Sequence, residues 1–230
     1  MWNKKVVSLF LLAIIFIAVG GCGGGGGGSG RYTLPGEIPT PGTGTGTGTG
    51  TGETNPDALI ASAWEDFKYG AYSSAISKFN QVLSIPGITE TQRVDSYNGL
   101  GWSQAKSGGM EAGYSAFSQA STGGNAEGKI GLAATLVQRG QRPGLLQAIQ
   151  ALTEVGLSNT SYRYQSTHPI GVSNAEAHAM LAFCYFWRGQ AGDDALARNQ
   201  INVARTEDGS ADSSVAQIYK TLKDMGLTGI

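Results

Sequence analysis

The sequence predicts an all-α domain in which helical hairpins stack side by side as an α-solenoid. Three observations predict this fold class. From Pro56 onward, apolar residues recur at the three- and four-residue spacing of amphipathic helices. Glycines interrupt that pattern where helices are expected to end, at Gly70, Gly108, Gly140 and Gly189. The residues around these glycines also correspond from one pair of helices to the next.

The first expected hairpin begins with a clear helix-start signal. Asn55 is a favoured N-cap residue, and Pro56 suits the first helical position because it needs no hydrogen-bonded N–H there. The stretch ALIASAWEDFKY continues this helix as far as the first glycine. A second helix, AYSSAISKFNQVL, places its apolar and aromatic residues on one face and ends before Pro86 and Gly87.

Three more hairpins and a final helix are expected after the first. The second hairpin begins near Thr89, and its turn glycine, aromatic and small residues match those of the first at a constant offset of 38 residues. Further hairpins turn at Gly140 and Gly189. The last stretch, SADSSVAQIYKTLKDMG, is expected to form one amphipathic helix that closes the stack with its polar side outward. A helix lying on a membrane surface is the alternative for this stretch.

The second hairpin resembles a tetratricopeptide repeat. It has the family's order of large, small and aromatic residues: Tyr97, Leu100, Gly101, Gly108, Met110, Gly113, Phe117 and Ala120. The resemblance extends over about residues 57–206, with turn glycines 38, 32 and 49 residues apart against a family period of 34. It implies that small residues let helices approach closely while aromatic residues fill the gap to the next hairpin.

The same resemblance implies a binding surface. In this family the first helices of the hairpins line a concave groove that binds a peptide or a helix of another protein. Carried over to this sequence, the expected groove contacts are Asn98, Gln104 and Lys106.

An insertion, LSNTSYRYQSTHPIGVSN, spans about residues 157–174 between the third and fourth hairpins. It breaks the helical periodicity, and the alternation in SYRYQ could support a short extended segment. Because insertions in solenoids gather on one face, often the binding face, we consider three of its residues as contacts: Tyr162, Tyr164 and His168. A spacer that plugs the end of the stack is the alternative. Ser173 and Glu176 then form a capping box for the next helix.

Residues 1–21 have the layout of a secretory signal peptide. Lys4 and Lys5 precede an apolar run of about 14 residues, which is shorter than the roughly 20 residues that span a bilayer. The end of this run, Val19-Gly20-Gly21-Cys22, resembles the lipobox of bacterial lipoproteins, and the resemblance implies that an acylated Cys22 is the mature N-terminus. A permanent transmembrane helix and an ordinary secretory signal with an incidental cysteine are the alternatives.

The resemblance to lipoproteins also implies a location. Three acyl chains give a stable anchor, whereas one chain alone binds a membrane only marginally. Gly23 stands where the family's inner-membrane retention signal places an aspartate, which implies the outer membrane if the cell has one. Residues 22–54 are rich in glycine, threonine and proline and cannot repay the entropy of ordering, so they are predicted to form a flexible linker with a span of about 30 Å.

Composition narrows the classes of function. The formal net charge is -1, charged residues make up 14%, and no Lys/Arg cluster is present, so nucleic acid is a poor candidate partner. His168 and His178 are the only histidines, and neither belongs to a zinc-binding pattern. We expect no enzyme activity, no metal and no cofactor apart from the covalent lipid on Cys22. Cys184, flanked by apolar and aromatic residues, is expected to be a buried thiol.

These observations lead to one expected function and one alternative. The first is a lipid-anchored, exported adaptor whose groove binds an extended peptide or a helix of another cell-envelope protein. The alternative is a structural lipoprotein that binds a cell-wall glycan or a surface polysaccharide through Tyr162 and Tyr164.

Overall fold

The computed structural model describes residues 55–230, which form nine α-helices and one 3-10 helix, with no strand in this range. The predicted signal peptide, Cys22 and the linker over residues 22–54 lie outside the described residues. The helices are α2 (Pro56–Lys68), α3 (Tyr72–Leu83), α4 (Glu90–Gly108), η1 (Met110–Gly113), α5 (Tyr114–Thr122), α6 (Ala126–Arg139), α7 (Arg142–Val155), α8 (Asn174–Arg188), α9 (Asp193–Glu207) and α10 (Ser214–Asp224).

Side-chain caps begin the helices where the sequence predicts them. Asn55 accepts a hydrogen bond from the second residue of α2, and Thr89 caps α4. Ser173 and Glu176 form the predicted capping box at the start of α8. The helix ends are confirmed in the same way, because the glycines that follow α6 and α8, Gly140 and Gly189, adopt the left-handed conformation.

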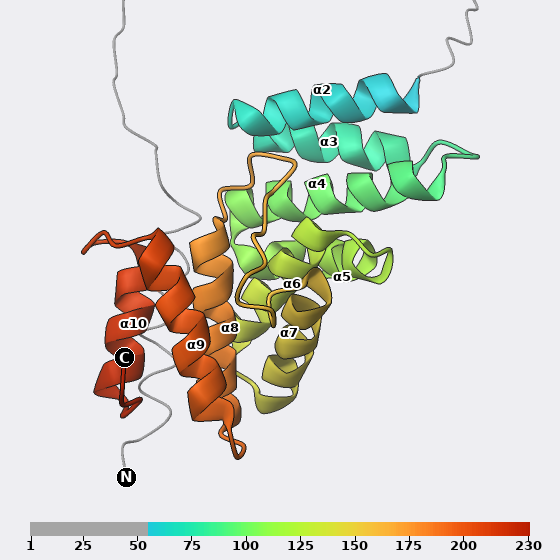
Figure 1. Cartoon of the computed structure of the whole chain (residues 1–230). Coiled ribbons are helices and arrows are strands. Elements are labelled where there is room, and N and C mark those ends of the chain that lie inside the picture. Colours follow the sequence, from blue (N-terminus) through green and yellow to red (C-terminus); the bar gives the residue numbers. More distant parts are fainter. Residues whose placement is uncertain (1–54) are drawn as a thin grey trace, which may run out of the picture.

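The helices stack in chain order (Figure 1). Each α-helix packs against the next along the chain, and α10 packs against both α8 and α9 at the end of the stack. The first helices of the four hairpins, α2, α4, α6 and α8, also contact one another in succession. We call the side of the stack that these four helices form the first-helix face. The prediction of an all-α stack of hairpins is therefore confirmed.

A phenylalanine-on-glycine contact repeats between neighbouring hairpins. The buried rings of Phe79 and Phe117 lie on Gly99 and Gly131, where an added Cβ would come within 2.0 and 2.4 Å of a ring atom. Both glycines stand nine residues before the turn glycine of their own hairpin, so the contact recurs at one register. The next interface has larger aliphatic residues at the corresponding positions, Ile149 and Met180.

The second helix of the second hairpin begins differently from the prediction. A short 3-10 helix, η1, precedes α5, whereas the predicted hairpin has a single second helix. The two backbones come very close at this point, since a Cβ on Gly113 would lie 2.4 Å from the carbonyl oxygen of Gly101. The glycine pair therefore permits a tighter approach than two ordinary helices reach.

The SYRYQ stretch, whose alternation suggested a short extended segment, forms no β-strand. Its residues belong to an irregular loop, and the backbone N–H of Tyr164 donates to the Asn174 side chain at 2.6 Å instead of to a neighbouring strand. A side chain thus takes the hydrogen bond that a sheet would have supplied.

Candidate functional site

The insertion between α7 and α8 lies against the first-helix face. Residues 156–173, which we call the insertion loop, run from the end of α7 toward α4 and α2 and return to the start of α8 (Figure 1). Irregular connections longer than about 12–15 residues are uncommon in compact domains and are usually functional or disordered. This one is anchored, because Leu157, Tyr164 and Ile170 are buried.

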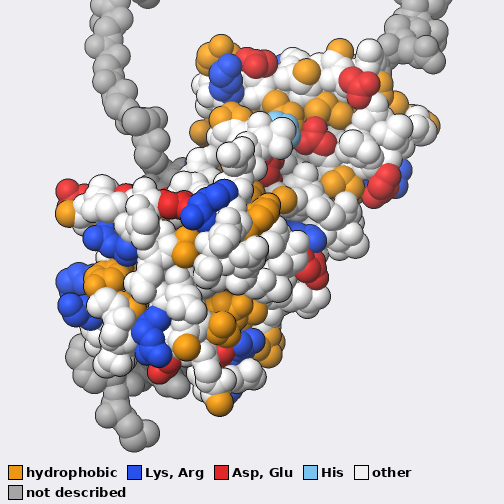
Figure 2. All heavy atoms as spheres, viewed as in Figure 1, with side chains coloured by type: hydrophobic (Ala, Val, Ile, Leu, Met, Phe, Trp, Pro, Cys, Tyr) orange, Lys and Arg blue, Asp and Glu red, His pale blue; other side chains and the backbone are white. Residues whose placement is uncertain are grey.

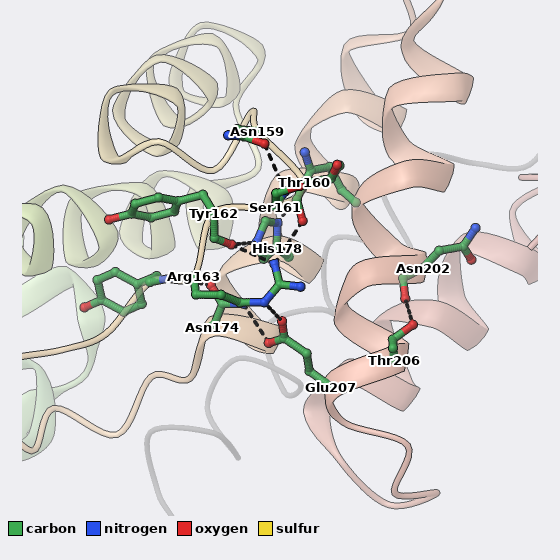
Figure 3. Close-up of polar contacts among 12 residues, drawn as sticks. Asn159, Thr160, Ser161, Tyr162, Arg163, Asn174, His178, Asn202, Thr206 and Glu207 are labelled. Atoms are coloured by element: carbon green, nitrogen blue, oxygen red, sulfur yellow. Dashed lines mark hydrogen bonds and ion pairs between the residues drawn. The ribbon is translucent and has the colours of Figure 1, made fainter.

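The base of the insertion loop is held by α8 and α9. Arg163 forms an ion pair with Glu207, with Nε and Oε1 2.7 Å apart, and Asn174 donates to the same carboxylate at 2.6 Å. Buried His178 faces the carbonyl oxygen of Tyr162 through Nε2 at 3.3 Å. Figure 3 shows these groups converging on the start of the loop from two helices. The loop therefore leaves the stack in a fixed direction.

The far part of the loop is held by an aromatic stack. The imidazole of His168 lies parallel to the indole of Trp64 on α2, with ring centroids 3.7 Å apart and an interplanar angle of 7°. The side chain of His168 remains 19% exposed. Figure 2 shows a small pale blue histidine patch at the surface, next to hydrophobic and acidic side chains.

Glu127, at the start of α6, is the polar centre of this contact. Its Oε2 lies 2.7 Å from Nδ1 of His168 and accepts a hydrogen bond from Asn98 on α4 at 2.6 Å. Its Oε1 accepts from the backbone N–H of His168 at 2.7 Å. One buried carboxylate therefore binds both the ring and the backbone of a single loop residue, in the manner of a receptor for a peptide.

Asp95 on α4 completes the acidic side of the site. Its Oδ1 accepts a hydrogen bond from the Trp64 indole at 3.2 Å and lies 3.8 Å from Nε2 of His168. Two carboxylates and one indole thus surround the imidazole of His168. Each comes from a different first helix: Trp64 from α2, Asp95 from α4 and Glu127 from α6. We call Trp64, Asp95, Asn98 and Glu127 the His168 subsite.

The two carboxylates of the subsite have opposite pKa shifts. Burial pushes the pKa of Glu127 up, but the hydrogen bonds from His168 and Asn98 together outweigh it and leave that pKa below its usual value. Burial raises the pKa of Asp95, and the proximity of His168 and the Trp64 hydrogen bond offset it only in part. Glu127 is therefore stabilised as an anion by its partners, and Asp95 is less so.

Two buried polar atoms beside the subsite have no hydrogen-bond partner among the described residues. They are Oδ1 of Asn98 and the hydroxyl of Tyr164. Burial, with Glu127 as a further cause, also raises the pKa of Tyr164, so the hydroxyl stays neutral. An unpaired buried polar group costs about 1–3 kcal/mol. Docking of the loop on this face therefore leaves two buried polar atoms without a hydrogen bond within the described residues.

The three groove residues expected from the repeat resemblance have different positions. Asn98 belongs to the subsite. Lys106 lies under the loop, with Nζ 3.3 Å from where a Cβ on Gly171 would be, and burial lowers the pKa of Lys106. Gln104 follows Asn98 by six residues, which places it about 120° away around α4, and its side chain is partly exposed.

The three insertion-loop residues named from the sequence differ in their exposure and in their contacts. His168 makes the subsite contacts, whereas Tyr164 is only 3% exposed and contributes to the core. Tyr162 is 36% exposed, and its ring lies against Gly156. Of the two tyrosines on which the glycan-binding alternative depends, Tyr162 is the one that a ligand in solution can reach.

Sequence reasoning missed Trp64, Asp95 and Glu127 as site residues. For Glu127 a signal existed, because it precedes Ile130 and Ala134 at the spacing of one helical face, and both are buried. A carboxylate at an apolar position of a helix indicates a buried partner. No comparable local signal distinguishes Trp64 or Asp95.

Comparison with known proteins gives no family: no family model, curated protein or solved structure matches this sequence. Over residues 55–230, no helix has both the length and the apolar character needed to cross a bilayer. Within the same residues, no three His, Cys, Asp or Glu side chains are placed to hold a metal ion.

Proposed function

We propose that this protein is a lipid-anchored adaptor of the bacterial cell envelope, in which tetratricopeptide-like hairpins bind an extended segment of another envelope protein on the first-helix face. In this proposal Cys22 carries the lipid and residues 22–54 link the anchor to the helical domain. The location is the outer membrane if the organism has one.

One observation carries the proposal: the first-helix face already holds a non-helical polypeptide segment. Trp64 stacks on a side chain of that segment, and Glu127 accepts hydrogen bonds from both its ring and its backbone. Aromatic stacking and charge-assisted hydrogen bonds are the contacts by which peptide-binding surfaces combine affinity with a defined register.

The exposed residues of α4 allow a matched cross-linking test. Thr91 is exposed and lies one turn before Asp95, about 40° away around the helix, whereas exposed Arg93 lies about 160° from Asp95. A photoreactive amino acid is introduced at either position in cells. The cross-linked partner peptide is then identified by digestion and mass spectrometry. The cross-linking is repeated in vitro with the purified partner.

The proposal expects one envelope protein, cross-linked through one segment, from position 91 and not from position 93. It also expects Cys22→Ser to lose the cross-link in cells while the purified domain still binds. Equal capture from both positions, or capture of cell-wall glycan alone, would contradict the adaptor function.

A further inference from the structure

The insertion loop contacts the first-helix face as a separate ligand would. Its base is held by α8 and α9 through Arg163 and the carbonyl of Tyr162, while its far part contacts α2, α4 and α6 through His168. The two sets of contacts share no residue. The far part can therefore detach from the subsite without loss of the Arg163 and Tyr162 contacts that hold the base, and its detachment exposes Ile170, which is buried in the docked tip.

We propose that the tip of the insertion loop, residues 166–171 (STHPIG), is an internal ligand that occupies the partner's own binding site, and that the partner presents a histidine-proline segment to the same subsite. This inference rests on the proposed adaptor function. In the free protein the tip fills the His168 subsite, and the partner's segment displaces it.

The chemistry of the subsite specifies the partner's segment. Trp64 offers a flat aromatic face, and Glu127 and Asp95 offer acceptors for an imidazole and for a backbone N–H. A segment with an acidic residue at this point would place like charges together, so the partner carries a neutral or cationic ring. Proline after that residue favours the extended backbone that keeps the N–H directed at the carboxylate, as Pro169 does after His168.

The docked tip leaves a buried acceptor of the subsite unpaired, so the partner's segment has one more hydrogen bond to gain there than the tip makes. Oδ1 of Asn98 is buried without a partner while the subsite is occupied by His168. A segment that supplies one additional donor at this position makes a hydrogen bond that the tip does not make. The partner can thus compete with a loop that is covalently attached and always present.

The first test uses the peptide acetyl-STHPIG-amide and the full-length protein in detergent. An occupied site raises the apparent dissociation constant in inverse proportion to the free fraction, so a tip that is docked nine-tenths of the time masks binding about tenfold. We expect His168→Ala to bind the peptide about tenfold more tightly than the unaltered protein, and Gln165→Ala, an exposed change in the same loop, to bind like the unaltered protein. A peptide with alanine in place of histidine should bind neither.

Equal binding of the histidine peptide to His168→Ala and the unaltered protein, or no binding to either at millimolar peptide, would overturn the inference. Circular dichroism establishes that each variant is folded. If the cross-linking from position 91 succeeds while this peptide test fails, the adaptor function stands and only the internal-ligand inference is lost.

A second measurement needs no variant. The chain has two histidines, so their imidazole signals can be resolved by NMR in labelled protein with unlabelled peptide. His168 is stacked on an indole, and we expect saturating peptide to move its ring signals toward the position of a free histidine. Buried His178 serves as the internal control and should not move. Unchanged His168 signals at saturation would contradict displacement.

Discussion

The Glu127→Gln substitution isolates the contact on which both proposals depend. The change keeps the size of the side chain and removes its charge. The carboxylate accepts three hydrogen bonds, two from His168 and one from Asn98. A glutamine has one acceptor oxygen, and its amide nitrogen then faces a donor. At least one of the three hydrogen bonds must therefore be lost, and any that remain have a neutral acceptor instead of a charged one.

The size of the effect follows from the charge of the acceptor. A hydrogen bond to a charged group contributes about 1.5–3 kcal/mol, against about 0.5–1.5 kcal/mol for a neutral one. Because His168 is partly exposed, we take the lower end and expect docking of the loop tip to weaken by about 2 kcal/mol. That difference corresponds to roughly a thirtyfold increase in the opening equilibrium.

Amide hydrogen exchange measures this opening directly. The backbone N–H of His168 donates to Glu127, so its exchange rate should rise about thirtyfold in Glu127→Gln. The N–H of Ile170, which donates to the carbonyl of His168 at 2.8 Å, should follow it. Amides of α9 report on global stability and should change less. Unchanged exchange at His168 would refute the role assigned to Glu127.

The pKa of Glu127 adds a pH dependence with a defined sign. Because docking lowers that pKa below 4.5, the stabilisation by Glu127 is complete above about pH 4.5 and is lost as the pH falls through the docked-state pKa. Exchange at His168, corrected for its intrinsic rate, should therefore increase in acid for the unaltered protein and show no such increase for Glu127→Gln.

Asp95→Asn is the matched control for this prediction. Burial raises the pKa of Asp95, which means that the folded state disfavours its anion and that stability from this group rises as the pH falls. Asparagine keeps an acceptor for the Trp64 indole and carries no charge. We expect loop docking at pH 7 to be unchanged or stronger, opposite to Glu127→Gln. A loss as large as that of Glu127→Gln would contradict the distinction between the two carboxylates.

Two further substitutions and one labelling experiment test the fold around the site. Gly131→Ala places a Cβ within 2.4 Å of the Phe117 ring and should lower the free energy of unfolding by about 1–3 kcal/mol in urea titration; an unchanged midpoint would refute the close contact. Tyr164→Phe removes a buried hydroxyl without a partner and should leave stability equal or raise it, whereas a clear loss would reveal a missed hydrogen bond. Burial raises the pKa of the Cys184 thiol to about 12, so it should resist thiol reagents in the native protein and react after unfolding; rapid native labelling would contradict its burial.

Local signals in the sequence are sufficient to predict most of the stack. Helix starts at Asn55, Thr89 and Ser173 depend on side chains within three residues of the cap, and helix ends depend on glycines with positive φ. These features are set by short-range geometry, so they can be read without knowledge of the fold. The 3-10 start at Met110 depends instead on the close approach of Gly113 to Gly101, which joins two helices.

The candidate site depends on contacts that local patterns do not encode. His168 meets Glu127 across 41 positions of sequence, and its stack on Trp64 joins the insertion loop to the first helix of the domain. Asn98 was named because the repeat resemblance places first-helix residues on the expected binding face, and the structure places it beside Glu127. Gln104, carried over by the same resemblance, lies about 120° from Asn98 around α4.

The central claim is that the first-helix face binds a segment of another envelope protein at the His168 subsite. The most direct test compares cross-linking from position 91 in the unaltered protein, in Glu127→Gln and in Asp95→Asn, at equal expression. The account predicts one captured partner segment, containing histidine followed by proline. Its yield falls in Glu127→Gln, where the weaker docking of the loop tip offsets part of the loss, and persists in Asp95→Asn. A partner captured equally well by all three proteins would contradict the claim.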